Sequence, residues 1–225
     1  MTQEPPSSID VYQAMSTLRA VRRLRPDPIP PDVLQRVFTA ATWAPTGANI
    51  QPWRIIAVSD LTLKAALQAL YAPEWQKYTA NTQARLAGLA PEEQEKQQRT
   101  LAAGDYLAEH FHAAPVIAVV CFNPDHMAIT DQKLKRVSLV GGASVYPAVE
   151  NLLLACRAEG LGCVLTTLLC LKESEVINLL GIPEGWYTAA AIPIGYPVGR
   201  GHGSIRRRPV SKLVFQDQFG EPFKA

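Results

Sequence analysis

The chain has 225 residues, of which 48% are hydrophobic and 19% charged, and its formal net charge is +2 at pH 7. This length and composition predict a single globular domain, residues 1–225, with a sizeable apolar core. The small net charge excludes a general attraction to nucleic acid or to an anionic membrane. Residues 1–8 are polar and proline-rich, so we expect a disordered tail and no signal peptide.

The cysteine pattern indicates a reducing compartment. Cys121, Cys156, Cys163 and Cys170 lie among apolar neighbours and form no C-x-x-C pair. Thiols in such surroundings are typical of buried, reduced cysteines. We therefore expect a cytoplasmic protein without disulfides.

Two helices are predicted near the N-terminus. Residues 7–10 form an S-x-x-D start signal, and the helix that follows is predicted to run into the basic stretch 19–25. Pro31 is placed to open a second helix, which must end near Ala44 because Pro45 follows it.

Four strands and two further helices complete the expected elements. The continuous apolar run at 116–121 is typical of a central strand. Asp60 can cap a helix that runs through Leu70, and Gly181 can end a short helix over 173–180. The other expected strands cover 53–58, 163–167 and 188–194.

The longest apolar helix is predicted at 145–161. Pro147 stands early in it and Gly160 can stop it. Charged residues, including Glu150 and Arg157, interrupt it well short of the ~20 apolar residues that span a bilayer. Because its apolar positions cover more than one stripe, we expect burial on most sides and packing against a partner subunit.

Two segments differ from this core. Residues 71–112 begin with a stretch rich in Gln, Glu, Lys and Ala, which predicts one or two exposed helices lying over the rest as a variable lid. Residues 215–225 are too polar to form a core alone, so we expect a C-terminal arm that reaches a partner.

No set of catalytic side chains is evident from the sequence. His110 and His112 alternate at a predicted helix end, which supplies no complete metal site. A G-x-S-x-G motif is absent, and the glycine-rich loop 195–204 lacks the order of a dinucleotide fingerprint. We therefore predict no metal and no catalytic side chain, so that a cofactor would carry any reaction.

Two basic clusters could together bind a phosphorylated cofactor. One comprises Arg19, Arg22 and Arg23, and the other lies at 206–208. Guanidinium groups match phosphate oxygens in geometry and charge, although solvated surface charge is the alternative for either cluster. Between them lies APTGANIQPW at 44–53, in which glycine permits close approach to a ligand and two prolines stiffen the loop.

Taken together, these segments resemble the FMN-dependent nitroreductase family. The resemblance covers nearly the whole chain except 71–112. It is carried by LRAVRRLRPDPIP at 18–30, AATWAPTGANIQPWRIIAV at 40–58, ASVYPAVENLLLACRAEGLGCVLTT at 143–167, AIPIGYP at 191–197 and RRRPVSKLV at 206–214.

The resemblance implies an α+β fold with a mixed, mostly antiparallel sheet flanked by helices. It also implies a homodimer with the long central helix at the interface and two FMN sites there. The residues that the resemblance assigns to FMN are Arg19, Arg22, Arg23, Pro45, Thr46, Gly47, Asn49, Leu165, Thr166, Thr167, Arg207 and Arg208, with Thr166 and Thr167 near flavin N5.

The function implied is ping-pong hydride transfer from NADH or NADPH, through FMN, to a nitroaromatic or quinone. Trp75 and Tyr78 are predicted to line the acceptor pocket, with ordinary packing as the alternative. A reductive dehalogenase or a flavin-cleaving enzyme on the same scaffold is a second hypothesis. A poorly catalytic protein that stores or senses FMN is a third, and a flavin-free binding module is a fourth.

Overall fold

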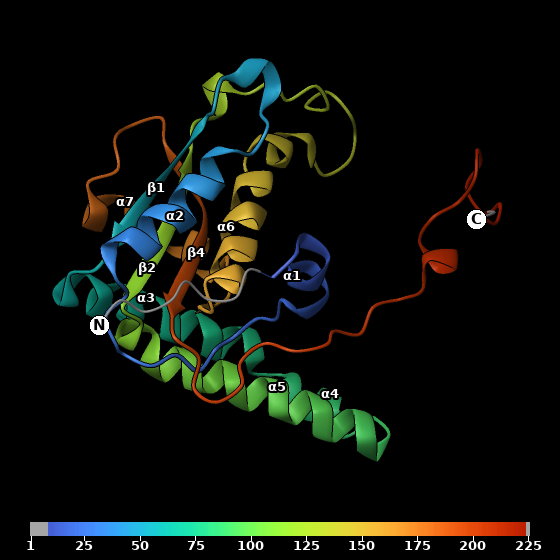
Figure 1. Ribbon diagram of the computed structural model, residues 1–225, viewed down its shortest axis with the longest axis horizontal. Helices are drawn as coiled ribbons and strands as arrows, with labels where there is room; N and C mark the ends of the chain where they lie inside the picture. The colour runs from blue at the N-terminus through green and yellow to red at the C-terminus, as the bar shows by residue number, and fades with distance from the viewer. Residues whose placement is uncertain (1–8, 224–225) are drawn as a thin grey trace.

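The computed structural model describes residues 9–223, without the side chains of residues 83 and 84, so the predicted tail at 1–8 lies outside it. Helices and strands are interspersed along the chain (Figure 1). The helices are α1 Val11–Thr17, α2 Pro31–Thr42, α3 Leu61–Thr79, α4 Thr82–Leu86, α5 Pro91–His110, α6 Tyr146–Ala158 and α7 Glu173–Leu180. The strands are β1 Trp53–Val58, β2 Val116–Phe122, β3 Gly162–Cys163 and β4 Tyr187–Gly195.

The four strands form one antiparallel sheet in the order β1-β2-β4-β3. β2 lies inside this sheet, which confirms the prediction from its apolar run. Its side chains alternate between two cores: Ala118 and Val120 join one, whereas Ile117 and Val119 join the other. The sheet is therefore covered on both faces, and the predicted α+β class is confirmed.

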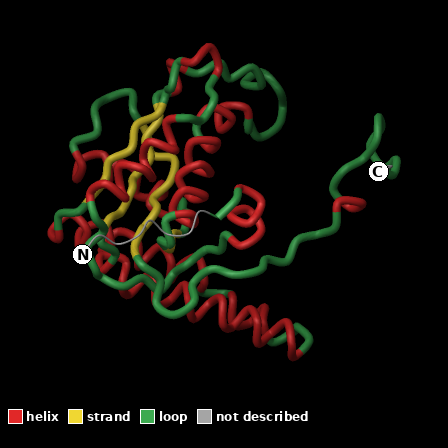
Figure 2. Tube along the Cα trace, viewed as in Figure 1, coloured by secondary structure: helices red, strands yellow, loops and turns green. Residues whose placement is uncertain are grey.

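Different helices cover the two faces. α2 and α6 pack together over one face, where Val37, Leu152 and Ile192 are fully buried. α3 and α5 enclose the other face around Leu67 and Phe111. The views in Figures 1 and 2 show the sheet between these groups of helices.

The central helix is shorter and less enclosed than predicted. α6 has Pro147 in its first turn, and Gly160 just beyond its end has φ 72°. Ala148, Leu152 and two further residues are buried, but Leu153 and Leu154 are only half-buried. Within one copy of the chain α6 fully buries one face and leaves most of its other residues half-buried, so the expected packing of those sides against a partner subunit stays a prediction.

The first helix ends before the arginines, which corrects the prediction of a basic helix end. α1 stops at Thr17, and Leu18 is extended, with ψ 123°. The backbone beyond it pairs with β3 of the sheet: Ala20 bridges Cys163, and the Val21 N–H donates to the Cys163 carbonyl at 2.9 Å. Residues 19–25 therefore continue as an extended segment.

The predicted strand at 163–167 is also shorter than expected. β3 ends at Cys163, and beyond it Thr166 makes an isolated bridge with Ala191.

Residues 71–112 are helical as predicted, but α3 continues through Pro73 to Thr79 without a break. Within the part of the chain that the structure describes, no helix is long and apolar enough to cross a bilayer.

After β4 the chain leaves the body of the molecule. Residues 205–223 run outward as an extended arm that ends far from the sheet (Figure 1). Val210, Leu213 and Phe219 on this arm are exposed, Phe219 at 95%. The predicted C-terminal arm thus projects from the chain, whereas its contact with a partner stays a prediction.

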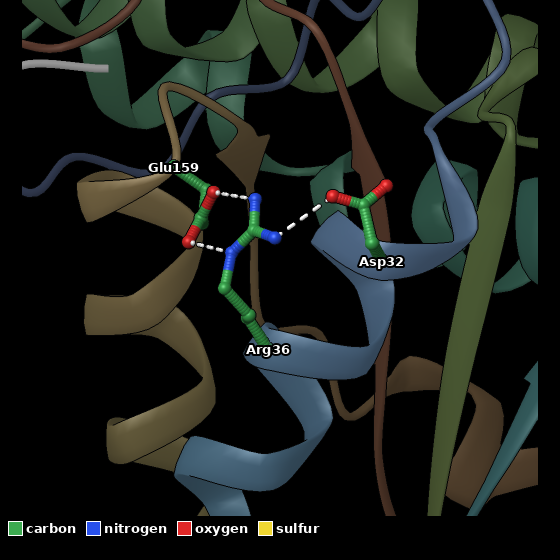
Figure 3. A network of polar contacts seen from close by, with 3 residues as sticks. All are labelled: Asp32, Arg36 and Glu159. Atoms are coloured by element: carbon green, nitrogen blue, oxygen red, sulfur yellow. Dashed lines mark hydrogen bonds and ion pairs between the residues drawn. The ribbon is translucent and has the colours of Figure 1, made fainter. Parts of the chain in front are cut away.

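An ion-pair network ties α2 to the end of α6 (Figure 3). Arg36 donates from Nε and Nη2 to the two carboxylate oxygens of Glu159, at 2.8 and 2.9 Å, and from Nη1 to Asp32 at 2.8 Å. The hydrogen bond from Arg36 lowers the pKa of Asp32 below its ordinary value of 3.8. The stabilisation linked to this shift is present above pH 3.8 and is lost as the pH falls through the folded-state pKa.

We expect Glu159→Gln to lower the urea midpoint of unfolding, because the two-pronged ion pair loses its charge. The matched control is Glu95→Gln, which breaks the pair with Arg99, a pair exposed on both sides. That control should leave the midpoint almost unchanged. Equal effects of the two substitutions would show that the pairing of Glu159 contributes nothing beyond a surface ion pair.

Candidate cofactor site

The arginine-bearing segment is fixed along its length by backbone hydrogen bonds. Val21 is bonded to Cys163, and the Arg25 N–H donates to the Tyr196 carbonyl at 2.7 Å. Val21 and Leu24 are buried, which anchors the segment in the core. The side chains between them belong to a rigid strip of backbone.

Arg22 and Thr166, one of the predicted flavin neighbours, both influence the same buried side chain, Tyr71. Both act on the buried phenol of Tyr71: burial raises its pKa, while a hydrogen bond with Thr166 and the charge of Arg22 oppose that rise. Arg22 is half-buried and Thr166 is 9% exposed. A guanidinium, a hydroxyl and a phenol therefore share one partly enclosed environment.

The other two predicted arginines are directed elsewhere. The Arg19 guanidinium donates to the Ser204 carbonyl, from Nε at 3.1 Å and also from Nη2. The Arg23 guanidinium stacks 4.5 Å above the ring of Tyr106 on α5. Both retain donors that a ligand could use, whereas Arg22 is the arginine of this cluster whose charge acts on Tyr71 together with Thr166.

The 165–167 segment is held against β4. Thr166 and Ala191 exchange two backbone hydrogen bonds, at 2.9 and 2.8 Å. The Thr166 hydroxyl also accepts from the Leu168 N–H at 3.4 Å. Leu165 is half-buried and Thr167 is exposed, so this segment presents one buried and one accessible hydroxyl.

The Pro45–Asn49 loop forms a second, separate group. Thr46 organises it by accepting from the Gln51 N–H at 3.0 Å through its hydroxyl and from the Asn49 N–H at 3.0 Å through its carbonyl. Ala48, Asn49 and Gln51 all have positive φ, between 50° and 57°. Non-glycine residues in this conformation are uncommon and cluster at functional sites.

This loop borders a cavity of about 450 Å³. Sequence reasoning found one wall, formed by Pro45, Thr46 and Gly47, but missed the other. The missed wall follows a long polar loop with no periodicity, and the small-residue run at 141–144 was its only signal. Ala48, Ile50 and Pro52 belong to the segment already singled out at 44–53, and the missed wall consists of His126, Ala128, Val140, Ala143 and Ser144.

The two groups lie at opposite ends of α6. Ser144, just before the helix, lines the cavity, whereas Arg157 in the last turn of α6 bonds Thr17, beside the arginine segment, at 2.9 Å. Thirteen helical residues span about 20 Å. Figure 1 places the loop between α2 and β1 and the chain after α1 at these two ends. One copy of the chain thus separates the predicted flavin residues into two candidate half-sites: the first comprises the arginine segment and residues 165–167, and the second comprises the loop at 45–49 and its cavity.

The remaining predicted residues belong to neither half-site. Arg207 and Arg208 lie on the exposed arm, where the Arg207 side chain bonds only the neighbouring carbonyl of Arg206. Trp75 donates to Asp105 at 2.7 Å and packs so closely on α5 that a Cβ at Gly104 would lie 2.1 Å from its ring. The role of Trp75 in an acceptor pocket therefore stays a prediction beside a definite packing role.

Tyr78 is 72% exposed, and its ring centroid lies 6.0 Å from that of Trp75. Its contact with an acceptor also stays a prediction.

Among the thiols, burial raises the pKa of Cys121 to about 11, which keeps this side chain protonated at neutral pH.

The structure is an α+β fold in which the arginine segment and the loop at 45–49 lie at opposite ends of one helix. A sequence profile of the nitroreductase family matches residues 16–196, and the chain belongs to this family. Iodotyrosine deiodinase 1 of Rattus norvegicus is 29% identical over 209 residues, which are 92% of this chain and 69% of that protein. NADH dehydrogenase of Thermus thermophilus is 28% identical over 222 residues, covering 92% of this chain and 95% of that protein.

Solved structures confirm the nitroreductase-like fold. Oxidized iodotyrosine deiodinase bound to FMN and 3-iodo-L-tyrosine has a TM-score of 0.68 at 22% identity, over 93% of this chain and 99% of that one. A nitroreductase with bound FMN from Desulfitobacterium hafniense has a TM-score of 0.64 at 19% identity, over 92% and 97% of the two chains.

Proposed function

We propose that this chain is an FMN-dependent oxidoreductase that acts as a homodimer and passes electrons from NADH or NADPH to a small organic acceptor. The observation that carries the proposal is that the arginine segment and the loop at 45–49, both part of the resemblance to the family, lie at opposite ends of α6. Family membership supports the cofactor, and the names of the relatives support a redox activity.

The donor chemistry of the half-sites fits a flavin phosphate. The half-buried guanidinium of Arg22 would bind the phosphate or the pyrimidine edge of the flavin, with Arg19 and Arg23 nearby. Thr166 would supply its hydroxyl, and Thr167 a hydroxyl or backbone donor, near N5, since the Thr166 N–H already donates to Ala191. The loop at 45–49, fixed by Thr46, would form the opposite wall.

FMN, when bound, supplies the centre that takes up hydride from the nicotinamide and gives it to the acceptor. The chain's own residues bind, orient and shield it. The two backbone bonds to Ala191 fix Thr166, so a donor at this position is preorganised and needs no rearrangement as charge develops. We assign no catalytic side chain, because solvent can provide the protons.

A homodimer would join the half-sites. A two-fold axis across the middle of α6 would place the arginine end of one copy beside the loop end of its partner. The half-buried Leu153 and Leu154 of α6 and the exposed Val11 and Met15 of α1 provide apolar surface for such contact.

The C-terminal arm would extend this interface. β1 is an edge strand, and beside it lies a groove of about 400 Å³ bordered by Phe38, Trp53 and Ile55. Among the described residues, the buried indole N–H of Trp53 has no hydrogen-bond partner. An extended segment from the partner subunit could cover the groove and accept from this N–H, and it would carry Arg207 and Arg208 with it.

We consider two classes of electron acceptor. Nitroaromatics or quinones are our first proposal, since the family includes nitroreductases. Reductive dehalogenation of a halogenated phenol is the second, because iodotyrosine deiodinases from several animals match most of this chain. Flavin cleavage and storage of FMN with little turnover remain weaker alternatives.

The test uses the purified full chain. We expect flavin absorption bands, bleaching by NADH or NADPH without oxygen, and recolouring by one acceptor class, either nitrobenzoate and quinone or 3-iodotyrosine. Arg22→Ala should reduce FMN affinity about 10- to 100-fold through loss of charge-assisted bonds, with exposed Arg99→Ala as the control. Colourless protein that takes up no added FMN would overturn the proposal, and yellow protein that stays oxidised with excess NAD(P)H would favour storage.

We also propose a cytoplasmic location. The four cysteines are free, and three of them are buried, as expected for a protein that folds under reducing conditions.

A further inference from the structure

The imidazole of His202 links the two segments that carry the first half-site. Its Nε2 lies 2.8 Å from the Leu161 carbonyl oxygen, and the Arg19 backbone N–H points to its Nδ1 at 3.5 Å. Leu161 directly precedes β3 and the predicted flavin neighbours at 165–167, and Arg19 begins the arginine segment. The ring thus stands where a direct hydrogen bond between the two backbones would otherwise continue the Ala20–Cys163 bridge.

These contacts specify one state of the ring. The Leu161 carbonyl can only accept, so Nε2 must carry the proton, and the Arg19 N–H can only donate, so Nδ1 must be bare. This is the neutral imidazole with its proton on Nε2. A second proton would have to bind Nδ1, and the resulting N–H would point at the backbone N–H of Arg19.

The surroundings of His202 strengthen this requirement. The side chain is 7% exposed, and the next residue, Gly203, donates from its N–H to the Thr17 carbonyl at 3.1 Å. The charged groups that face the ring are Arg157 from α6 and Arg19, both positive. The ring is held between two backbone segments, and only the Leu161 carbonyl favours a positive charge on it, against burial and two arginines.

We propose that His202 is a positioning residue that relays a hydrogen bond from Arg19 to Leu161, and that the arginine segment keeps its FMN-binding geometry only while this relay is neutral. The inference rests on the proposed function. It adds a residue from a glycine-rich loop that makes no assigned contact with the flavin, and it makes cofactor retention dependent on pH.

The direction of the dependence follows from the structure. Burial lowers the pKa of His202 below its ordinary value of 6.5; the hydrogen bond to the Leu161 carbonyl opposes this shift, and the charges of Arg157 and Arg19 act in the same sense as burial. The unfolded chain therefore binds the proton more readily than the folded one. The stabilising contribution is complete above pH 6.5 and falls as the pH drops from 6.5 through the folded-state pKa.

The decisive variant is His202→Gln, because an amide offers one donor and one acceptor but does not titrate in this range. FMN dissociation constants are measured at pH 8.0 and pH 5.5 for the wild type, for His202→Gln and for His112→Gln. His112 is an exposed histidine that contacts Gln68 far along the chain from the relay. Protonation of the FMN phosphate affects all three proteins alike and cancels in the comparison.

At pH 8.0 we expect His202→Gln to bind FMN within about threefold of the wild type, because the relay is preserved. Between pH 8.0 and 5.5, the wild type and His112→Gln should lose about tenfold more affinity than His202→Gln, within the usual range for coupling between two linked sites, because the proton that His202 takes up opposes binding. His202→Ala should bind weakly at both values, and its failure to fold would not affect the comparison with Gln.

Equal pH dependence in the wild type and His202→Gln would overturn the relay. A second readout separates this failure from failure of the proposed function: the urea midpoint of the flavin-free protein from pH 8.0 to 5.5. If no variant binds FMN, the proposed function is wrong, and the relay is then judged on stability alone. A smaller fall in midpoint for His202→Gln would support it, and parallel curves would refute it.

Discussion

Mixed dimers built from Arg22→Ala and Gly47→Leu chains are expected to bind FMN at one of their two sites, although neither variant alone retains it. Arg22 lies in the half-site that includes Thr166, and Gly47 lies in the half-site at the other end of α6. If each complete site takes one half from each copy, the mixed dimer contains one site with both defects and one with neither.

The Gly47 variant is chosen because it should block the cavity without disturbing the loop. A Cβ at this position would meet only the Ser144 hydroxyl, at 4.0 Å. The larger part of a leucine side chain would then fill the cavity of about 450 Å³ that the flavin is proposed to share. Arg22→Ala removes a charge but leaves the buried anchors Val21 and Leu24 in place.

Two affinity tags on coexpressed chains allow the mixed dimer to be isolated. Its FMN content should be about one per dimer, against about two for the wild type and nearly none for either parent. Dimers of two differently tagged Arg22→Ala chains provide the control and should stay empty. A mixed dimer as empty as its parents would show that the half-sites do not join across copies.

Much of the fold was predictable because local signals and burial agree. Asp60 caps α3 by accepting from the Leu63 N–H at 2.8 Å, and Gly181 ends α7 in the left-handed conformation. The runs that became β1, β2 and β4 have the composition of buried strands, and the structure keeps them within one or two residues of their predicted limits. In each case the residue's own chemistry determines the local backbone.

The errors have a common cause in long-range pairing. Arg19 and Arg22 follow a well-formed helix, and nothing local stops that helix from continuing to them. The backbone is extended there because Cys163, far along the chain, accepts from Val21. Long-range pairing also accounts for the short β3. Beyond Cys163 the chain leaves the regular ladder and pairs with β4 again only at the isolated bridge between Thr166 and Ala191.

The candidate site was predictable in its residue types but not in its arrangement. Arginines, a threonine pair and the Thr46 loop are visible as motifs, but their division between the ends of α6 depends on how the helices pack. His202 gave no signal, because its role comes from contacts with Arg19 and Leu161 that are distant in sequence. A residue that acts through two backbone groups leaves no motif.

Gly162→Ala is expected to destabilise the fold and to weaken FMN binding together. A Cβ at Gly162 would lie 2.7 Å from Val21 Cγ1 and 2.9 Å from Leu24 Cδ2, closer than real Cβ contacts. Overpacking of this kind costs about 1–3 kcal/mol. Because the displaced side chains anchor the segment that carries Arg22, the strain should reach the first half-site and lower FMN affinity in proportion.

A double-mutant cycle with Val21→Ala tests this mechanism. Val21→Ala alone should also be destabilising, since Val21 is 6% exposed, but it removes the methyl group that the new Cβ would strike. The double variant should therefore be more stable than the sum of the single effects by about 1 kcal/mol, a coupling expected only between residues in contact. Unfolding in urea at matched protein concentration gives the free energies, and FMN titration should show the same partial rescue.

Gly88→Ala, whose Cβ would meet only a carbonyl oxygen at 3.9 Å, is the control and should change neither quantity. Strictly additive free energies would mean that contact with Val21 is not the reason why position 162 requires a glycine.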